Sequence, residues 1–418
     1  AFTSFRSVFT WPILTDEDKA ALMFVTDNLK MSAIDITKEF EKEYASWIGV
    51  DYALGYCNGT AAVQGALWAC GVGAGDEVIG PSLTYWASCA PALNLGAAVN
   101  FADVDPETLC IDPDDIEHRI GERTKAIVVV HYAGYPADMD RIMAIAKKHN
   151  VKVIEDSSHS HASLYKGRYT GALGDISASS MMSSKAFAIG EAGMITTNNR
   201  ELYERCISFG HYERTGVGNR ARPEDQTLTN DDLIKYAGIP FGGKKDRMNQ
   251  WCSAVGRVQL KHFPARVAEI DKAMNYFADG LEKIKGLKVH RPAADSGSTK
   301  GGWYFPLCHF NPEEMGISAA KFCEAVRAEG VHLASAGANA PLHLHPMFHT
   351  ADIFNMGQPT MLSFGQRDVR QGKGALPVTE KVKERVITLP HFIKFDKEVI
   401  DLYISAYKKV SENIAEIK

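Results

Sequence analysis

The sequence predicts an α/β protein, in which a large domain with a mostly parallel sheet is followed by a smaller α+β domain. Short apolar runs alternate with helical patterns between residues 52 and 197, which is typical of βαβ units. The run Lys125–His131 is β-branched and largely apolar, as expected of a central parallel strand. The composition shifts near residues 262–270. We therefore expect an arm and a large domain over residues 1–265, and a small domain over residues 266–418.

The composition is that of an ordinary globular protein. The 418 residues are 45% hydrophobic and 23% charged, and a formal net charge of −5 gives no general electrostatic footprint for nucleic acid. The eight cysteines form no CxxC pair, which favours reduced thiols. We expect no signal peptide and no membrane-spanning run. These features predict a cytoplasmic protein that binds neither nucleic acid nor a membrane.

The N-terminal part is expected to be an arm followed by two helices. Residues 1–14 are predicted to be extended. Thr15 then precedes three acidic residues, which favour a helix start because the helix dipole attracts negative charge there. An amphipathic pattern predicts a second helix over Ile36–Ile48.

Four candidate site residues follow the expected strands of the large domain. These strands are Tyr52–Tyr56, Glu77–Ile79, Ala98–Phe101, Lys125–His131, Val153–Ile154, Asp175–Met181 and Ala192–Thr197. The helices expected between them are Ala61–Cys70, Ala87–Gly96 and Asp138–Lys148. Ligands of parallel sheets bind at the carboxyl ends of the strands. Gly59, Tyr85, Asp156 and Lys185 lie at or just after such ends, so we expect them to share one site.

The rest of the chain is expected to hold a long loop and the small domain. Residues 211–247 are polar and irregular, and a loop of this length is often functional. Two helices are predicted on either side of the domain boundary, Met248–His262 and Asp271–Lys285. The small domain should then contain strands at Lys288–His290 and Trp303–Phe310 and helices near residues 319–329 and 397–414.

Asp156 and Lys185 together predict a site for pyridoxal phosphate (PLP). A lysine amine can condense with the aldehyde of this cofactor. A carboxylate can pair with the pyridine nitrogen and keep it protonated, so that the ring accepts electrons. Either residue alone has a simpler explanation, because a single lysine is usually a surface residue and a single aspartate often caps a helix.

Gly59 and Thr60 form a turn between a strand and an alanine-rich helix. The free amides at a helix N-terminus bind anions, and glycine allows a close approach. We therefore interpret both residues as phosphate contacts. The alternative is that Thr60 only caps the helix and Gly59 only makes the turn.

Two other kinds of site are not supported by the spacing of their residues. His159 and His161, or His343 and His345, have no third ligand at a familiar zinc spacing. The glycine-rich run Gly71–Gly75 precedes a strand instead of following one, so it fails the context of a nicotinamide-binding fingerprint. We predict neither a metal site nor a nicotinamide site.

Motifs along nearly the whole chain carry a family resemblance. They are Asn58–Ala62, Pro81–Tyr85, Asp103–Asp105, Ala137–Asp140, Ile154–His159, Tyr165–Arg168, Gly174–Ile176, Ser180–Lys185, Gly190–Met194, Arg247–Met248, Pro341–His343 and Leu376–Val378. In this order they resemble the DegT/DnrJ/EryC1/StrS family of PLP-dependent sugar aminotransferases. The resemblance implies the aspartate aminotransferase architecture, which is PLP fold type I.

The resemblance also implies roles around the cofactor ring. Lys185 matches the Schiff-base lysine of the family, and Asp156 matches the acid on the pyridine nitrogen. His159 matches a position, usually Gln or His, near the ring hydroxyl. Tyr85 matches the aromatic residue that stacks on the ring.

The phosphate contacts implied by the resemblance include one departure. Gly59 and Thr60 match the phosphate turn, and Ser180 matches a serine just ahead of the lysine. The family motif Gly-x-Asn-x-Arg-Met has an Asn that reaches the phosphate of the neighbouring subunit, but here Lys245 stands in its place. A lysine can bind phosphate as a point charge. Whether Lys245 or Lys244 reaches the phosphate stays open.

For the reaction, the family implies transfer of an amino group from L-glutamate or L-glutamine to a keto-sugar, often nucleotide-linked, or to a keto-cyclitol. Ping-pong kinetics and a homodimer with shared active sites are expected. His343 is a candidate substrate contact, and residues 348–375 are a candidate specificity loop. The alternatives are a PLP-dependent sugar dehydratase and a regulatory PLP-binding protein. In the dehydratase branch a histidine replaces the lysine, so the presence of Lys185 disfavours it.

Overall fold

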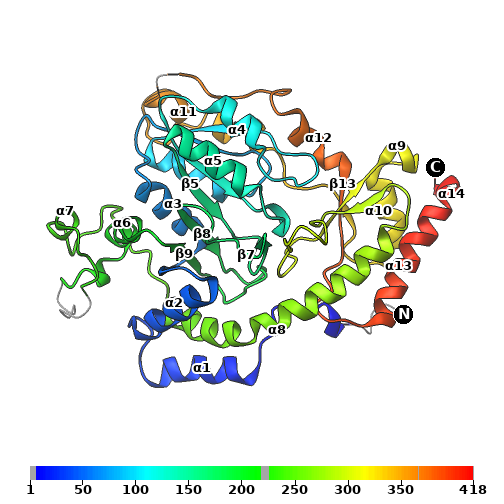
Figure 1. The fold of residues 1–418 in the computed structure, drawn as a ribbon, viewed down its shortest axis with the longest axis horizontal. Coiled ribbons are helices and arrows are strands. Elements are labelled where there is room, and N and C mark those ends of the chain that lie inside the picture. Colours follow the sequence, from blue (N-terminus) through cyan, green and yellow to red (C-terminus); the bar gives the residue numbers. More distant parts are fainter. Residues whose placement is uncertain (1–5, 218–225, 366, 418) are drawn as a thin grey trace.

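The chain folds around two sheets in the computed structural model, which describes residues 6–217, 226–365 and 367–417 (Figure 1). Seven strands of this described chain form the large sheet, in the order β1-β9-β8-β5-β4-β2-β3. Their bounds are β1 (Tyr52–Tyr56), β2 (Glu77–Pro81), β3 (Ala98–Ala102), β4 (Thr124–Val130), β5 (Lys152–Asp156), β8 (Ile176–Ser180) and β9 (Gly193–Thr197). A separate hairpin consists of β6 (Leu164–Tyr165) and β7 (Arg168–Tyr169).

Strand direction in the large sheet confirms the predicted mostly parallel arrangement. Neighbouring strands from β3 to β8 are parallel, while β9 is antiparallel to both β8 and β1. The central strand β4 is buried at every position except Lys125. Both faces of the sheet are therefore covered, as expected for crossovers that return over a parallel sheet.

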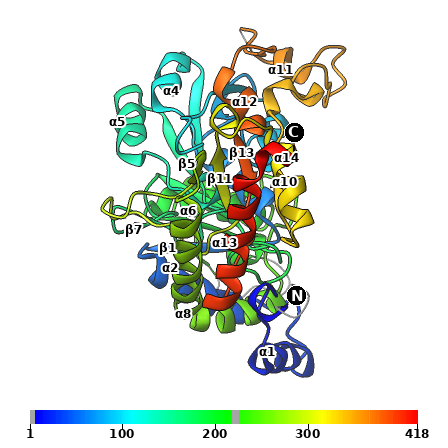
Figure 2. The ribbon, with the colours of Figure 1, turned by 90° about the vertical axis from the view of Figure 1, so that its right-hand side faces the viewer.

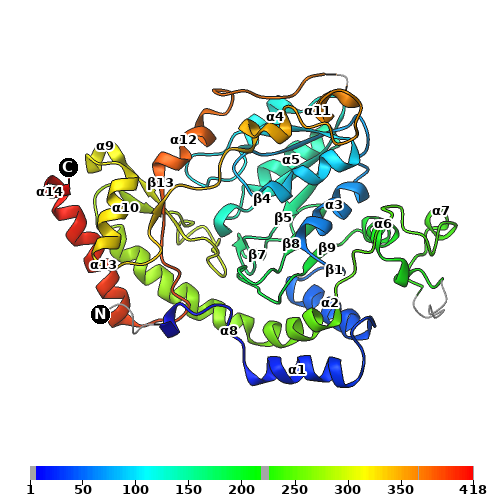
Figure 3. The ribbon, with the colours of Figure 1, turned by 180° about the vertical axis from the view of Figure 1, so that it is seen from behind.

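Helices cover both faces of this sheet (Figures 1 and 3). One face carries α3 (Gly59–Ala69) and α6 (Arg200–Gly210), and the other carries α4 (Pro113–Arg119) and α5 (Met139–His149). The helix predicted over Ala87–Gly96 is wrong, because the chain forms two 3-10 helices there, Trp86–Ser88 and Ala90–Leu95. Pro91 lies in the first turn of the second one, and Gly96 ends it at φ +79°.

Two further helices lie below the sheet in Figure 1, α1 (Asp16–Asp27) and α2 (Asp35–Ile48). The predicted start of α1 is confirmed, since Thr15 and Asp18 form a capping box. In the predicted loop 211–247 the structure contains the short helix α7 (Asp231–Ile234), while residues 218–225 lie outside the described residues. The helix α7 projects at the end of the molecule opposite α13 and α14 (Figure 3).

One long helix, α8 (Gln250–Leu281), replaces the two helices predicted around residues 262–270. The two-helix prediction is wrong, although Pro264 lies inside the helix and lacks an amide hydrogen. Phe263 packs in a core beneath the large sheet, and Ile270 packs in the core of the small domain. Tertiary burial on both sides of the proline thus keeps the helix intact. The expected boundary at residue 265 falls inside α8.

The small sheet confirms the smaller α+β part of the fold. Its strands are antiparallel in the order β10-β11-β13-β12, with bounds β10 (Leu287–Val289), β11 (Leu307–Phe310), β12 (Ser335–Ala336) and β13 (Val386–Thr388). The helices in this half of the chain are α9 (Pro312–Met315), α10 (Ala319–Ala328), α11 (Thr360–Ser363), α12 (Pro377–Arg385), α13 (Lys397–Glu412) and α14 (Ile414–Ile417). The helix α13 packs along α8 (Figure 2).

Two segments pack outside the sequence blocks expected for the domains. Val8, in the N-terminal arm, belongs to the core of the small sheet. Leu342, Phe348, Met361 and Leu376 belong to the core of the large sheet. The candidate specificity loop 348–375 therefore packs on the large domain.

Among the described residues, no helix has the length and apolarity needed to cross a membrane.

Candidate active site

The carboxyl edge of the large sheet brings the predicted acid and lysine into one site. Asp156 is the last residue of β5 and is 5% exposed. The Ser88 hydroxyl donates to its Oδ2 at 2.6 Å, and the Ser158 amide donates to its Oδ1 at 3.1 Å. These bonds fix the carboxylate at the sheet edge, where it can face a ring nitrogen.

Lys185 follows β8 and is 7% exposed. Its Nζ lies 4.3 Å from the centroid of the Tyr304 ring. Its backbone carbonyl accepts a hydrogen bond of 2.8 Å from the Trp11 indole. Within the described residues, no carboxylate forms an ion pair with this amine. The amine is thus buried without an internal counter-ion, as a lysine that forms an imine requires.

The N-terminus of α3 and Ser180 form a narrow cradle. The Asn58 side chain accepts from the Ala61 amide at 2.8 Å, so Asn58 caps the helix and the alternative role of Thr60 as the cap is wrong. In the described chain, no hydrogen bond uses the amides of Gly59 and Thr60. A Cβ on Gly59 would lie 2.5 Å from the Ser180 Cβ. Two free amides, a hydroxyl and this close approach fit a phosphate group.

We expect Gly59→Ala to weaken PLP binding by about tenfold to a hundredfold. The added methyl group would push Ser180 away from the turn, and such overpacking typically costs about 1–3 kcal/mol of free energy. Equilibrium titration of the visible absorption band measures this affinity. Gly73→Ala is the matched control, because its Cβ would have no atom nearer than 3.9 Å. Unchanged PLP affinity in Gly59→Ala would argue against a phosphate at this turn.

His159 is a buried, neutral hydrogen-bond donor in the same site. Burial and the nearby Lys185 ammonium lower the pKa of His159 well below its usual value. Its Nδ1 accepts from the Ala133 amide at 3.4 Å, so the single ring proton belongs on Nε2. This donor fits the ring oxygen of PLP, as the family resemblance implies. An acid, an amine, a phosphate cradle and a neutral donor together match the functional groups of PLP.

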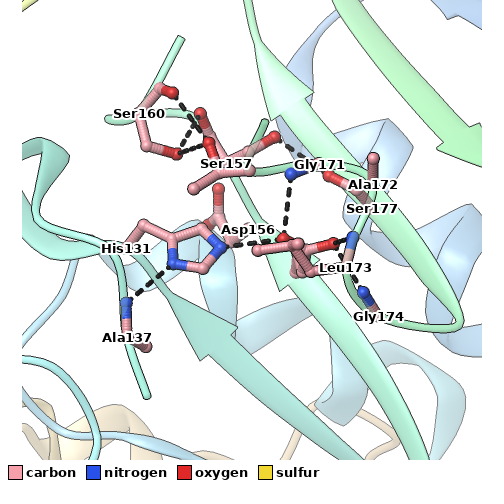
Figure 4. Close-up of polar contacts among 12 residues, drawn as sticks. His131, Ala137, Asp156, Ser157, Ser160, Gly171, Ala172, Leu173, Gly174 and Ser177 are labelled. Atoms are coloured by element: carbon pink, nitrogen blue, oxygen red, sulfur yellow. Dashed lines mark hydrogen bonds and ion pairs between the residues drawn. The ribbon is translucent and has the colours of Figure 1, made fainter. Parts of the chain in front are cut away.

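Glu155, beside Asp156, belongs to a separate structural network, whose other members His131, Ala137, Gly171, Leu173 and Gly174 are labelled in Figure 4. The His131 Nδ1 accepts from the Ala137 amide at 3.0 Å, so its Nε2–H donates to Glu155 at 2.9 Å. Three backbone amides, those of residues 171, 173 and 174, also donate to this carboxylate at 2.7–2.8 Å. Burial alone would raise the pKa of Glu155, but these hydrogen bonds lower it below its usual value.

We expect Glu155→Gln to reduce the free energy of unfolding by about 2–4 kcal/mol near neutral pH, because an amide faces donors that need an acceptor. Since the folded pKa of Glu155 is lowered, its contribution is present above the unfolded pKa of about 4.3 and is lost as the pH falls through the folded value. Urea unfolding from neutral to acidic pH measures both effects. Glu117→Gln at an exposed ion pair should change little, and an equal loss in both variants would contradict the prediction.

A cavity of about 770 Å³ lies beside the cradle. Its lining residues are Asn58, Thr60, Ala61, Gln64, Trp86, Ala90, Pro91, Asn94, Glu191, Lys244, Leu342, His345, Met347 and Phe348. Trp86 lines it, whereas the neighbouring Tyr85 is 50% exposed and lies outside this set. Lys244 lines it too and pairs with Asp246 at 3.2 Å, while Lys245 is exposed above the Tyr212 ring.

The chain as a whole matches known aminotransferases. The family model described as the DegT/DnrJ/EryC1/StrS aminotransferase family matches residues 12–407. The chain belongs to this family. An L-glutamine:2-deoxy-scyllo-inosose aminotransferase of Streptoalloteichus tenebrarius is 30% identical over 85% of this chain and 80% of its own. A GDP-perosamine synthase of Escherichia coli O157:H7 is 34% identical over 68% of this chain and 73% of its own. The crystal structure of an aminotransferase from Psychrobacter cryohalolentis has 30% identity and a TM-score of 0.82, covering 97% of this chain and 100% of its own.

Membership confirms the predicted aminotransferase class, the PLP dependence and the fold. In this DegT-family site, His343 is not one of the described residues that line the cavity. Its Nδ1 contacts the Ser82 hydroxyl at 2.7 Å, and its Nε2 contacts Glu380 at 3.1 Å. His343 thus anchors the segment whose residues Leu342 and His345 line the cavity, and its contact with substrate stays a prediction.

Three residues of this DegT-family site were missed by sequence reasoning. Ser88 follows β2 and holds Asp156. Trp11 comes from the arm and holds the Lys185 carbonyl, and Tyr304 comes from the C-terminal half of the chain. Ser88 has a weak signal, since it is polar and follows a strand end. Trp11 and Tyr304 have none, because no local spacing links them to Lys185.

Proposed function

We propose that this aminotransferase transfers the amino group of L-glutamate or L-glutamine to the ring ketone of a sugar or cyclitol by a ping-pong mechanism. The main support is the buried amine of Lys185, which forms no ion pair among the described residues. It lies at the same sheet edge as Asp156 and the phosphate cradle. Family membership implies an amino donor and a keto acceptor.

Each residue has one task in this proposal. PLP, when bound, supplies an aldehyde for the amine and a ring that accepts electrons. The Gly59 and Thr60 amides and the Ser180 hydroxyl would hold its phosphate. Asp156 would keep the proton on the ring nitrogen, which opposite charge favours. Lys185, once released by the amino donor, would move the proton at the donor's α-carbon as a general base.

The acceptor that we propose first is a nucleotide-linked keto-sugar, and the cavity supports a keto-cyclitol as the second candidate. A nucleotide-linked substrate brings a diphosphate, which cationic groups usually bind. Among the described lining residues, Lys244 is the one lysine or arginine, and it already contacts Gln64 and Asp246. Cations for a diphosphate would then come from a second subunit, whereas an uncharged cyclitol needs none.

We also propose a cytoplasmic homodimer with shared active sites. Lys245 is exposed, so its ammonium is available to the phosphate site of a partner subunit. Lys244 is committed to its own chain by Gln64 and Asp246. In a dimer of this kind, Lys245 rather than Lys244 would replace the expected asparagine.

The visible absorption spectrum of the PLP-loaded protein tests the proposal. L-glutamine or L-glutamate should bleach the cofactor band, and the bleached protein should recover it with one acceptor, either scyllo-inosose or a nucleotide-linked keto-sugar. Recovery with a cyclitol would favour the second candidate. A band untouched by every amino acid would overturn the proposed transamination, and no band after incubation with PLP would overturn the role of Lys185.

A further inference from the structure

Tyr304 lies against the proposed imine-forming lysine although it comes from a distant part of the chain. Its ring centroid is 4.3 Å from the Lys185 Nζ and 4.7 Å from the His159 ring. It precedes β11 of the small sheet, whereas Lys185 and His159 belong to the large domain. Among the described aromatic rings, Tyr304 is the one that stands over the Lys185 ammonium.

Contacts from both parts of the fold hold the segment around Tyr304. The Trp303 indole donates to Asp271 of α8 at 2.9 Å. The Gly302 amide donates to the His161 carbonyl at 3.1 Å, and the Gly302 carbonyl accepts from the His391 ring at 3.0 Å. These three contacts hold residues 302 and 303, and with them the backbone that leads into Tyr304.

The backbone on both sides of Tyr304 adopts a conformation that ordinary residues avoid. Trp303 has φ +52° and Phe305 has φ +53°, both in the left-handed region that disfavours side chains with a Cβ. Gly301 has φ +51°, and a Cβ there would lie 2.4 Å from the His161 carbonyl oxygen. Such strain persists only where surrounding contacts impose it, and it concentrates at functional sites. Here the strained residues flank Tyr304, whose ring lies beside the Lys185 amine.

We propose that Tyr304 is a positioning residue that holds the Lys185 amine in place whenever that amine is not bonded to the cofactor. The face of an aromatic ring attracts an ammonium group and also packs against its aliphatic stem. A carboxylate would bind the same group more strongly and oppose its release. The ring therefore gives the amine a defined direction without a counter-ion. This inference rests on the proposed function of Lys185.

The first test measures how fast PLP-free protein takes up PLP, followed by growth of the visible band. Tyr304→Leu should slow uptake about tenfold, because the amine loses its orientation. Tyr304→Phe should stay within about twofold of the parent, because the ring face is retained. Tyr135→Leu is the matched control, since it removes a ring packed on His290 that makes no contact with Lys185.

The second test measures the primary isotope effect for bleaching by α-deuterated L-glutamine. It should increase in Tyr304→Leu, because a poorly placed amine makes proton transfer slower than the other steps. Urea unfolding reports whether each variant is folded, and Tyr304→Met provides a second ring-free side chain if Tyr304→Leu is not. Equal uptake rates and isotope effects in the parent and a folded ring-free variant would overturn the inference.

The two proposals fail in different ways. PLP uptake needs neither an amino donor nor a ketone, so it can reveal the role of Tyr304 even if transamination is not found. A protein that transaminates normally with a ring-free residue 304 would overturn the positioning role alone. Loss of PLP uptake in Lys185→Ala together with the parent uptake rate in Tyr304→Leu would leave the proposed function intact and reject this inference.

Discussion

Lys185→Ala is expected to slow the first half-reaction by about 10⁴-fold or more, because one substitution removes both the covalent link to the cofactor and the general base. The alanine variant should bind PLP without forming the imine band. Mixing the PLP-loaded protein with L-glutamine or L-glutamate and following the visible spectrum in a single turnover measures the loss.

The control for this variant is a lysine remote from the site. Lys166→Ala removes an exposed lysine that pairs with Asp140, and it should bleach at the parent rate. A single-turnover rate in Lys185→Ala within about a hundredfold of the parent would mean that another group moves the proton. The proposed mechanism would then be wrong.

Asp156→Asn is expected to have the second largest effect, a fall of about 10²- to 10⁴-fold in the rate of the first half-reaction. An asparagine keeps the shape of the side chain but loses the charge that holds a proton on the ring nitrogen. Its amide group would also face the Ser88 hydroxyl and the Ser158 amide, which now donate to the carboxylate. Weaker PLP binding should accompany the slower rate.

Glu155→Gln is the comparison that separates chemistry from folding. Glu155 and Asp156 are neighbours on β5, but successive side chains of a strand point to opposite faces. We expect Asp156→Asn to lose rate with little loss of stability, and Glu155→Gln to lose stability with little change in the rate of folded protein. The reverse result would show that the two carboxylates have been assigned the wrong tasks.

The large sheet and its site edge could be predicted because both depend on local signals. Strand-like runs at residues 125–131, 153–154 and 175–181 predict β4, β5 and β8, and parallel strands necessarily bring their carboxyl ends to one edge. Asp156 and Lys185 follow two such neighbouring strands. The strand pattern in the sequence therefore predicts that these two residues lie close together.

The remaining parts of the site depend on contacts that no local pattern contains. Tyr304 and Trp11 meet Lys185 only because the small domain and the arm fold back onto the large one. Two helices were expected on either side of residues 262–270, yet burial of Phe263 and Ile270 on the two sides of Pro264 outweighs the loss of one hydrogen bond. The same kind of tertiary contact places residues 342–348 at the cavity instead of in the small domain.

The unbroken α8 determines how the two halves of the molecule can move. A flexible linker would let the small domain, with Tyr304, turn freely away from Lys185. A continuous helix of 32 residues does not allow this, so any such rotation has to bend α8 itself. Pro264 already lacks one hydrogen bond of the helical ladder, so the cost of bending is lowest there. Pro264 lies within residues 262–270, where the composition predicted a domain boundary, so we expect any bend of α8 to centre there.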